Sequence, residues 1–159
     1  MEQAVVTAVT HDTSEAKVTV TGVPDQPGLA ARLFRALADE SVNVDTIVQN
    51  TSIHGTTDIS FTVPKVDLAT SLRVARDLAP VLGAGEVFAD DDVAKVSLVG
   101  AGMRSHPGIS ATMFETLAAA GINIEMISTS SIRISCVVRA EAVEEAVQAL
   151  HQAFHLSET

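Results

Sequence analysis

The chain repeats one order of elements twice: a strand, a Pro-Gly turn, an amphipathic helix and a second strand. The first copy covers residues 17–52, and the second begins at Lys95. When the two turns are aligned, the helix face and the following strand align as well, pairing Pro27 with Pro107, Gly28 with Gly108, Phe34 with Phe114, Leu37 with Leu117 and Asn43 with Asn123. A repeat of this kind indicates two copies of one folding unit.

Hydrophobic periodicity assigns the elements of the first unit. Residues 18–21 alternate Val and Thr, which is typical of a half-buried strand. Along 42–49, the even-numbered residues from Val42 to Val48 are expected on one face and the odd-numbered ones, through Gln49, on the other. The expected elements are a strand over 17–22, a helix over about 28–40, strands over 42–49 and 58–63, a helix over about 66–79 that Pro80, Gly83 and Gly85 end, and a strand over 86–89.

The second unit repeats this order but lacks a final strand. Its expected elements are a strand over 96–99, a helix over 109–119, strands over 122–127 and 133–138, and a helix over 141–154. A strand over 4–9, at the other end of the chain, has no unit of its own. We expect it to complete the second sheet, because an unpaired strand leaves backbone groups unbonded. Unit one, residues 17–92, is then inserted into unit two, which comprises residues 1–16 and 93–159.

Two βαββαβ units predict an α+β protein. Each unit is expected to be ferredoxin-like, with an antiparallel sheet of four strands and helices on one face. A sheet that is covered on one face needs a cover for its other face or its edge. We therefore expect the isolated chain to form a homodimer in which unit one of one chain meets unit two of the other.

Composition and charge argue against several classes of function. The chain has 20 acidic and 10 basic residues and a formal net charge of −10, which disfavours nucleic acid and anionic membranes as partners. No apolar stretch approaches the roughly 20 residues that span a bilayer, and the N-terminus has no signal-peptide pattern. The single cysteine, Cys136, cannot form an internal disulfide. We expect a soluble cytoplasmic protein.

The sharpest indication of an enzyme is the segment GAGMRS, residues 100–105, between an expected strand and an expected helix. With Glu125 downstream, it resembles a loose dinucleotide-binding fingerprint. However, Ser105 replaces the third small residue, Pro107 delays the helix, and Glu125 falls within a strand. No histidine pair has metal-ligand spacing, and Cys136 occupies an inward strand position. We therefore expect no catalytic residue, metal or cofactor.

The turns before the first helix of each unit favour binding instead. Unpaired N–H groups and the helix dipole at such a turn attract an anion such as a carboxylate. In unit one, Asp25 adds a candidate partner for an ammonium group, so that the two together describe an α-amino acid. The amides of Asn43, Gln49 and Asn123 could hydrogen-bond to a small polar side chain. The same residue types also cap turns and pair with backbone, and physical reasoning alone leaves both interpretations open.

Six segments carry a resemblance to a known family: SEAKVTV, DQPG, VNVDTIVQN, TTDISFTV, KVSLVGAGMRSHPG and INIEMISTS with IRIS. They are similar to tandem ACT domains, the small-molecule sensing module of amino-acid metabolism. They look most like the separate regulatory (β) subunits of the aspartate kinase family. The resemblance implies a sensor of threonine, often acting together with lysine, that joins a catalytic α subunit in an α2β2 assembly. It also implies that the kinase half is absent and that unit one is inserted.

The resemblance further implies a threonine site. By motif, the family's threonine contacts fall on Asp25, Gly28, Ala30 and Gln49 of one chain, and on Asn123 and Ile124 of a facing chain. Ser131 stands where the family usually has Glu, and this departure bears on the response to lysine and on dimer contacts nearby.

The leading function is a non-catalytic regulatory subunit of aspartate kinase that binds threonine for feedback inhibition of aspartate-family amino-acid biosynthesis. The alternatives are a small nucleotide-dependent enzyme that uses residues 100–105, and an ACT sensing subunit of another biosynthetic enzyme. The identity of the large partner separates the three.

Overall fold

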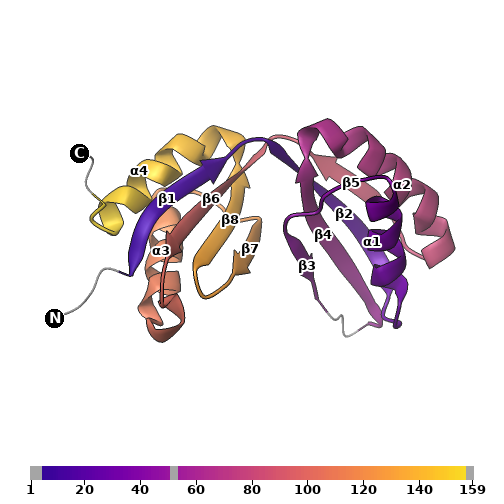
Figure 1. Ribbon diagram of the computed structural model, residues 1–159, viewed down its shortest axis with the longest axis horizontal. Helices are drawn as coiled ribbons and strands as arrows, with labels where there is room; N and C mark the ends of the chain where they lie inside the picture. Colours follow the sequence, from indigo (N-terminus) through magenta and orange to yellow (C-terminus); the bar gives the residue numbers. More distant parts are fainter. Residues whose placement is uncertain (1–4, 51–53, 157–159) are drawn as a thin grey trace. The chain divides into compact units, whose positions relative to one another are not determined.

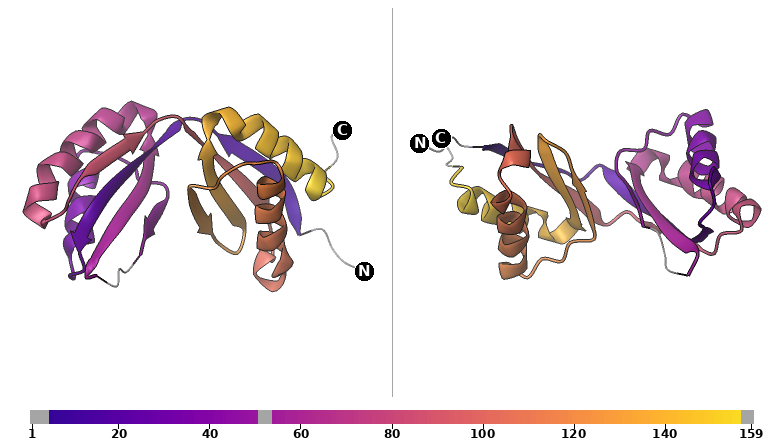
Figure 2. Two further views of the ribbon diagram at one scale, coloured as in Figure 1. Left: turned by 180° about the vertical axis from the view of Figure 1, so that it is seen from behind. Right: turned by 90° about the horizontal axis from the view of Figure 1, so that it is seen from below.

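The computed structural model describes residues 5–50 and 54–156 (Figure 1). These residues form two compact units: Ser14–Asp91, called unit one, and the described residues on either side of it, called unit two. Each unit is a four-stranded antiparallel sheet. Two α-helices cover one face of each sheet (Figure 2). The predicted α+β fold of two ferredoxin-like units is confirmed.

Unit one has the sheet order β3-β4-β2-β5. Its core lies between the sheet and the helices and includes Val18 and Phe61 from the central strands and Leu33 and Leu37 from the first helix, all fully buried. The elements are β2 (Glu15–Pro24), α1 (Leu29–Asp39), β3 (Ile47–Gln49), β4 (Thr56–Pro64), the 3-10 turn η1 (Lys65–Asp67), α2 (Leu68–Leu82) and β5 (Val87–Asp90).

Helix α2 does not end where the sequence suggested. Pro80 lies inside the helix, which continues to Leu82 and ends at Gly83 in a left-handed conformation with φ 74°. A proline lacks the N–H that would bond to the carbonyl four residues earlier, here that of Arg76. Pro80 and Arg76 are both exposed, so the missing hydrogen bond lies on the solvent-facing side of the helix. The glycine, which tolerates positive φ, therefore ends the helix.

The strand expected over 42–49 forms only in part. Val42 is buried in the core, but β3 begins at Ile47. In β3, Val48 lies opposite Ser60 and Gln49 lies opposite Ile59. Directly opposite residues share a face, so Gln49 lies on the face of the buried Ile59, toward the helices. The prediction that Val42 and Val48 share a face is wrong.

A bulge before β3 causes this change of face. The backbone N–H of Asp45 donates to the carbonyl of Thr62 (3.0 Å), and the N–H of Thr46 donates to the Oγ1 of Thr62 (3.1 Å). Two residues thus oppose one, which shifts the alternation by one position. Unit two repeats the feature, because the N–H of Glu125 donates to the carbonyl of Val137, whose direct partner is Met126.

Unit two has the sheet order β1-β6-β8-β7, with β1 antiparallel to β6. Strand β1 extends to Asp12 and β2 begins at Glu15, so most of the connection expected over 11–16 is strand. The elements are β1 (Val6–Asp12), β6 (Val93–Gly100), the 3-10 turn η2 (Met103–Ser105), α3 (Gly108–Ala119), β7 (Met126–Thr129), β8 (Arg133–Arg139), the 3-10 turn η3 (Ala140–Ala142) and α4 (Val143–Ala153).

Candidate ligand-binding site

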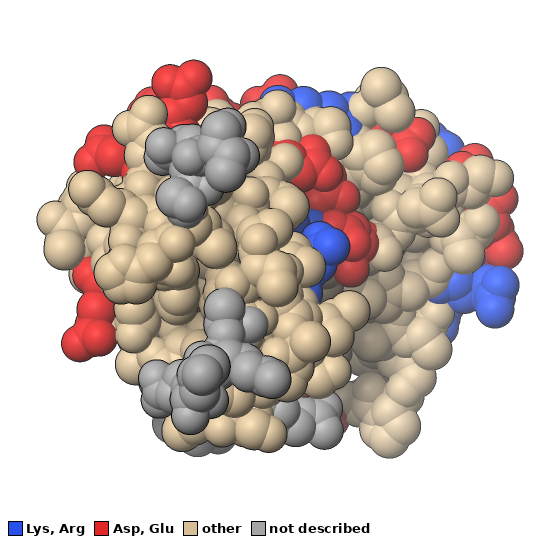
Figure 3. All heavy atoms as spheres, turned by 60° about the vertical axis from the view of Figure 1, so that its left-hand side comes forward, with Lys and Arg blue, Asp and Glu red and all other residues tan. Residues whose placement is uncertain are grey.

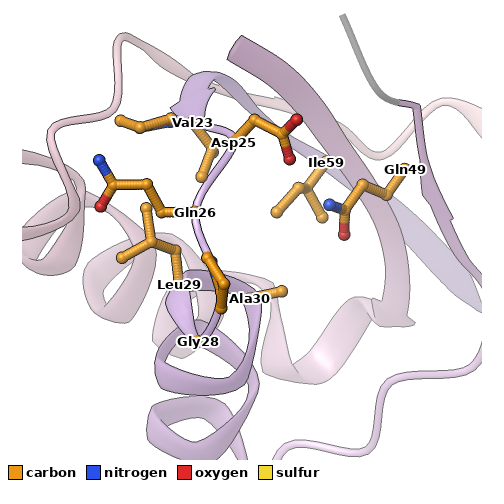
Figure 4. Close-up of a pocket in the computed structure, with 10 residues that line it drawn as sticks. Val23, Asp25, Gln26, Gly28, Leu29, Ala30, Gln49 and Ile59 are labelled. Atoms are coloured by element: carbon orange, nitrogen blue, oxygen red, sulfur yellow. The ribbon is translucent and has the colours of Figure 1, made fainter. Parts of the chain in front are cut away.

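The turn between β2 and α1 borders a pocket of about 340 Å³ (Figure 4). Its walls come from the end of β2, the turn, the first residues of α1, and facing residues of β3 and β4. The lining residues are Val23, Pro24, Asp25, Gln26, Pro27, Gly28, Leu29, Ala30, Gln49 and Ile59. Four of the residues that the sequence analysis assigned to a threonine site, namely Asp25, Gly28, Ala30 and Gln49, thus lie around one pocket.

The backbone of the turn is held by its own hydrogen bonds. The N–H of Asp25 donates to the carbonyl of Gly55 (2.8 Å), and the N–H of Gln26 donates to the carbonyl of Pro24 (2.9 Å). Pro27 has no N–H to offer. These backbone N–H groups are therefore not available to a ligand carboxylate, and the available N–H donors begin at Gly28.

The start of α1 is suited to an anion. No side chain in the described residues caps this helix, and its first turn contains no acidic residue. The first N–H groups of a helix have no partner within the helix, and the dipole places partial positive charge there. Gly28 has a φ of 90°, a left-handed conformation that glycine adopts without strain. The positive end of α1 consequently faces the pocket with no acidic residue in its own first turn.

Two polar side chains stand at the mouth of the pocket. In Figure 4, Asp25 and Gln49 lie on the same side, with Ile59 between them, and Ala30 points toward that side. Asp25 and Gln49 are exposed, whereas Ile59 and Val23 are buried and form an apolar wall. The pocket thus combines donors for a carboxylate, an acid for an ammonium group, an amide for a polar side chain and an apolar surface for a methyl group.

The two remaining predicted residues lie in unit two. Asn123 is exposed in the segment between α3 and β7, and Ile124 is half-buried against the core of that unit. Neither lines the pocket. Sequence reasoning missed Val23 and Ile59 as lining residues. The alternation of β4 indicates that Ile59 faces inward, whereas Val23 follows a register shift in β2 that the alternation of Val18 and Val20 does not predict.

The corresponding turn of unit two has a different structure. Between the aligned glycines it contains two additional residues, and it forms the 3-10 turn η2, which buries Met103 in the core. Ser105 stands at the position of Asp25, and Thr129 at that of Gln49. The carboxylate and the amide of the unit-one pocket are therefore not repeated.

The glycines of the GAGMRS segment have structural roles. A Cβ on Gly100 would lie 2.0 Å from the carbonyl oxygen of Val5, so the close approach of β1 requires a glycine. Gly102 has a φ of 68° and precedes η2. Glu125, the expected ribose partner, instead forms an ion pair with Arg139. The sequence suggested that Glu125 lies within a strand. In the structure it directly precedes β7, which begins at Met126. This geometry departs from that of a dinucleotide-binding turn.

The rest of the described chain shows neither a metal-binding cluster nor an activated cysteine nucleophile. Residues 5–50 and 54–156 contain no group of three His, Cys, Asp or Glu side chains that could hold a metal. Cys136 is buried in the core of unit two, as predicted, and burial raises the pKa of its thiol to about 12. A protonated thiol is a poor nucleophile.

The distribution of charged side chains on the surface agrees with the acidic composition of the chain. On the face drawn in Figure 3, basic side chains lie in small groups beside acidic ones and form no continuous basic surface. None of the helices within the described ranges is long and apolar enough to cross a membrane.

Comparisons with known proteins identify the family. The ACT domain family model matches residues 6–77 and 96–154. A crystal structure of aspartokinase alpha and beta subunits is similar, with a TM-score of 0.89, 46% identity, and coverage of 94% of this chain and 99% of that one. The regulatory subunit of aspartate kinase from Thermus thermophilus, in its ligand-free form, has a TM-score of 0.90 and 41% identity over 96% of this chain and 99% of that one. The chain belongs to the ACT-domain family and matches the regulatory region of aspartokinases.

Longer relatives show the same relationship. An aspartokinase of Mycolicibacterium smegmatis is 51% identical over 158 residues, which cover 98% of this ACT-domain chain and 38% of the relative. The chain thus spans little more than a third of the length of the curated relatives it matches.

Proposed function

We propose that this chain is a non-catalytic sensor subunit of an aspartate kinase. It binds threonine, with lysine as a second effector, and conveys feedback inhibition of aspartate-family amino-acid biosynthesis. The observation that carries the proposal is the pocket at the start of α1, where the uncapped helix end lies beside Asp25 and Gln49. The proposed location is the cytoplasm, where these amino acids are made.

Each part of threonine has a partner in this proposal. The carboxylate accepts hydrogen bonds from the N–H groups that begin at Gly28, and the ammonium group pairs with Asp25. The hydroxyl bonds to the amide of Gln49. The methyl group contacts the apolar wall at Ile59. Asn123 and Ile124 of a facing chain close the site.

The proposed partner is a catalytic α subunit that carries the nucleotide and aspartate sites. The pairing of alpha and beta subunits in a similar crystal structure supports this choice. Ser131 stands at the position where a glutamate is usual in the family, so the response to lysine is expected to be weaker than the response to threonine.

Co-purification from the native host tests the proposed partner. We expect a tagged chain to capture a larger subunit and aspartate kinase activity that threonine inhibits. The isolated chain should phosphorylate nothing. Capture of a different biosynthetic enzyme would assign the sensor to that enzyme, and kinase activity insensitive to threonine would contradict the proposed ligand.

We also expect the isolated chain to be a symmetric homodimer. The helix-free face and the edge strands β3 and β7 of its sheets leave surface that needs a partner. Exposed apolar side chains lie on both of these edge strands, Ile47 (50% exposed) on β3 and Ile127 (43% exposed) on β7. Light scattering with and without threonine should give twice the mass of the chain. A monomeric mass under both conditions would overturn this expectation.

A further inference from the structure

Arg139, the last residue of β8, binds two acidic side chains at once. Its Nη1 lies 3.2 Å from Oε2 of Glu125, and its Nη2 lies 3.3 Å from Oδ2 of Asp92. The side chains of Arg139 and Glu125 are 35% and 19% exposed, so this pair is partly shielded from water. A planar guanidinium can hold two carboxylates in a fixed geometry, which an ammonium group cannot do.

The two acids belong to segments with different roles. Glu125 directly follows Asn123 and Ile124, the residues proposed to close the threonine site of a facing chain. Its backbone also joins the sheet, because its N–H donates to the carbonyl of Val137 (2.8 Å). Ile124 packs against the core on one side of Glu125, and β7 begins on the other. The position of Asn123 therefore depends on how firmly Glu125 is held.

Asp92 marks the return of the chain into unit two. It is the first residue of that unit after Asp91, where unit one ends. The carbonyl of Asp92 accepts a hydrogen bond from the N–H of Ala140 (3.0 Å), next to Arg139. Arg139 thus joins the segment of Asn123 to the connection that leads from unit one.

Unit one does not contain this arrangement. When Phe61 is aligned with Cys136, the position of Arg139 is occupied by Pro64, although Asp45 stands at the position of Glu125. The bulge before the second strand of the unit, β3 or β7, is common to both units, whereas the residue at the end of the following strand is Arg139 in unit two and Pro64 in unit one. General requirements of the fold therefore do not explain Arg139.

We propose that Arg139 is a positioning residue for threonine binding. It holds Glu125 against Asp92 and thereby fixes the backbone of Asn123 and Ile124 in the orientation that closes the site of a facing chain. Through Asp92, it also links that segment to the connection between the units, so that ligand binding is transmitted to this connection. The inference rests on the proposed function, because it assigns Arg139 to the same threonine site.

The experiment measures threonine affinity by isothermal titration calorimetry on the full chain. The variants are Arg139→Gln, which removes both ion pairs, and Arg139→Lys, which keeps the charge. The matched control is Arg73→Gln, which removes the ion pair between Arg73 and Glu40 (3.1 Å) in unit one. We expect Arg139→Gln to raise the Kd about three- to tenfold, as coupled contacts of this kind do. Arg139→Lys should recover part of the affinity, and Arg73→Gln should change nothing.

A double-mutant cycle separates positioning from simple loss of stability. Glu125→Gln should raise the Kd by a similar factor, and the variant with both Arg139→Gln and Glu125→Gln should be no worse than either alone. A merely structural role predicts instead that melting temperatures fall while the Kd of the folded protein stays unchanged. Unaltered affinity in Arg139→Gln, with normal binding by the parent chain, would overturn this inference alone. Absence of threonine binding by the parent would overturn the proposed function as well.

Discussion

L-Threonine should raise the melting temperature of the chain, and Asp25→Ala and Gln49→Ala should each remove most of that increase. A ligand at about 100 times its Kd stabilises the folded state by about 2.7 kcal/mol. For a chain of this size, such stabilisation corresponds to a shift of roughly 5–10 °C. Both side chains are exposed at the mouth of the pocket, so the ligand-free variants should melt close to the parent temperature. Differential scanning fluorimetry measures both effects.

Two controls make this result specific. L-Valine replaces the hydroxyl of threonine with a methyl group and leaves the amide of Gln49 unpaired, at a cost of about 1–3 kcal/mol. Its shift should be much smaller at the same concentration. Asp39→Ala removes the same charge as Asp25→Ala, but from the exposed end of α1 outside the pocket, and should leave the threonine shift intact. If Gln49→Ala responds to threonine as the parent does, the ligand binds elsewhere.

Deletion of residues 1–12 should unfold or strongly loosen unit two while leaving unit one folded. The deletion removes β1 and with it Val6, which is 6% exposed in the core. It also leaves the edge of β6 unpaired between Lys95 and Gly100. Burial of Val6 contributes about 1.5–3 kcal/mol, and the lost backbone pairing of β1 with β6 adds to this. The total approaches the whole stability of a small domain, about 5–15 kcal/mol.

Hydrogen exchange measures the deletion locally. Amide protection in β6 and β8 should fall at least about 100-fold, since about 1.4 kcal/mol corresponds to a factor of ten. The amides of β2 and β4 in unit one provide the internal control and should keep their protection. Unchanged protection over 96–99 and 133–138 would show that β1 is dispensable for the second sheet.

The repeat made most of the fold predictable. The strand alternation and helix periodicity that it preserves locate the elements to within a few residues, and the cysteine at a core position was read correctly. The sequence analysis ended the helix at Pro80, because proline disfavours the interior of a helix. The structure instead keeps Pro80 within the last turn of α2. The solvent exposure that makes a proline tolerable in a last turn depends on the packing of the whole unit and is not visible in the local sequence.

The candidate site was less accessible to sequence reasoning. Alternation placed Gln49 away from Val42 and Val48, but its orientation toward the pocket depends on a bulge. In that bulge the N–H groups of Asp45 and Thr46 both bond to Thr62, a local pairing that periodicity cannot reveal. Likewise, the turn hydrogen bond from the N–H of Asp25 to Gly55 depends on the pairing of β2 with β4. The donors that remain for a ligand could be assigned only from the folded turn.

Titration of the isotopically labelled chain with L-threonine, followed by two-dimensional NMR, tests the central claim most directly. The account predicts saturable shifts that are largest for the backbone amides of Gly28, Leu29 and Ala30 and for the side-chain amide of Gln49, with little response to L-valine. A titration without saturable shifts, or one whose largest shifts lie in the η2 turn of unit two, would contradict it.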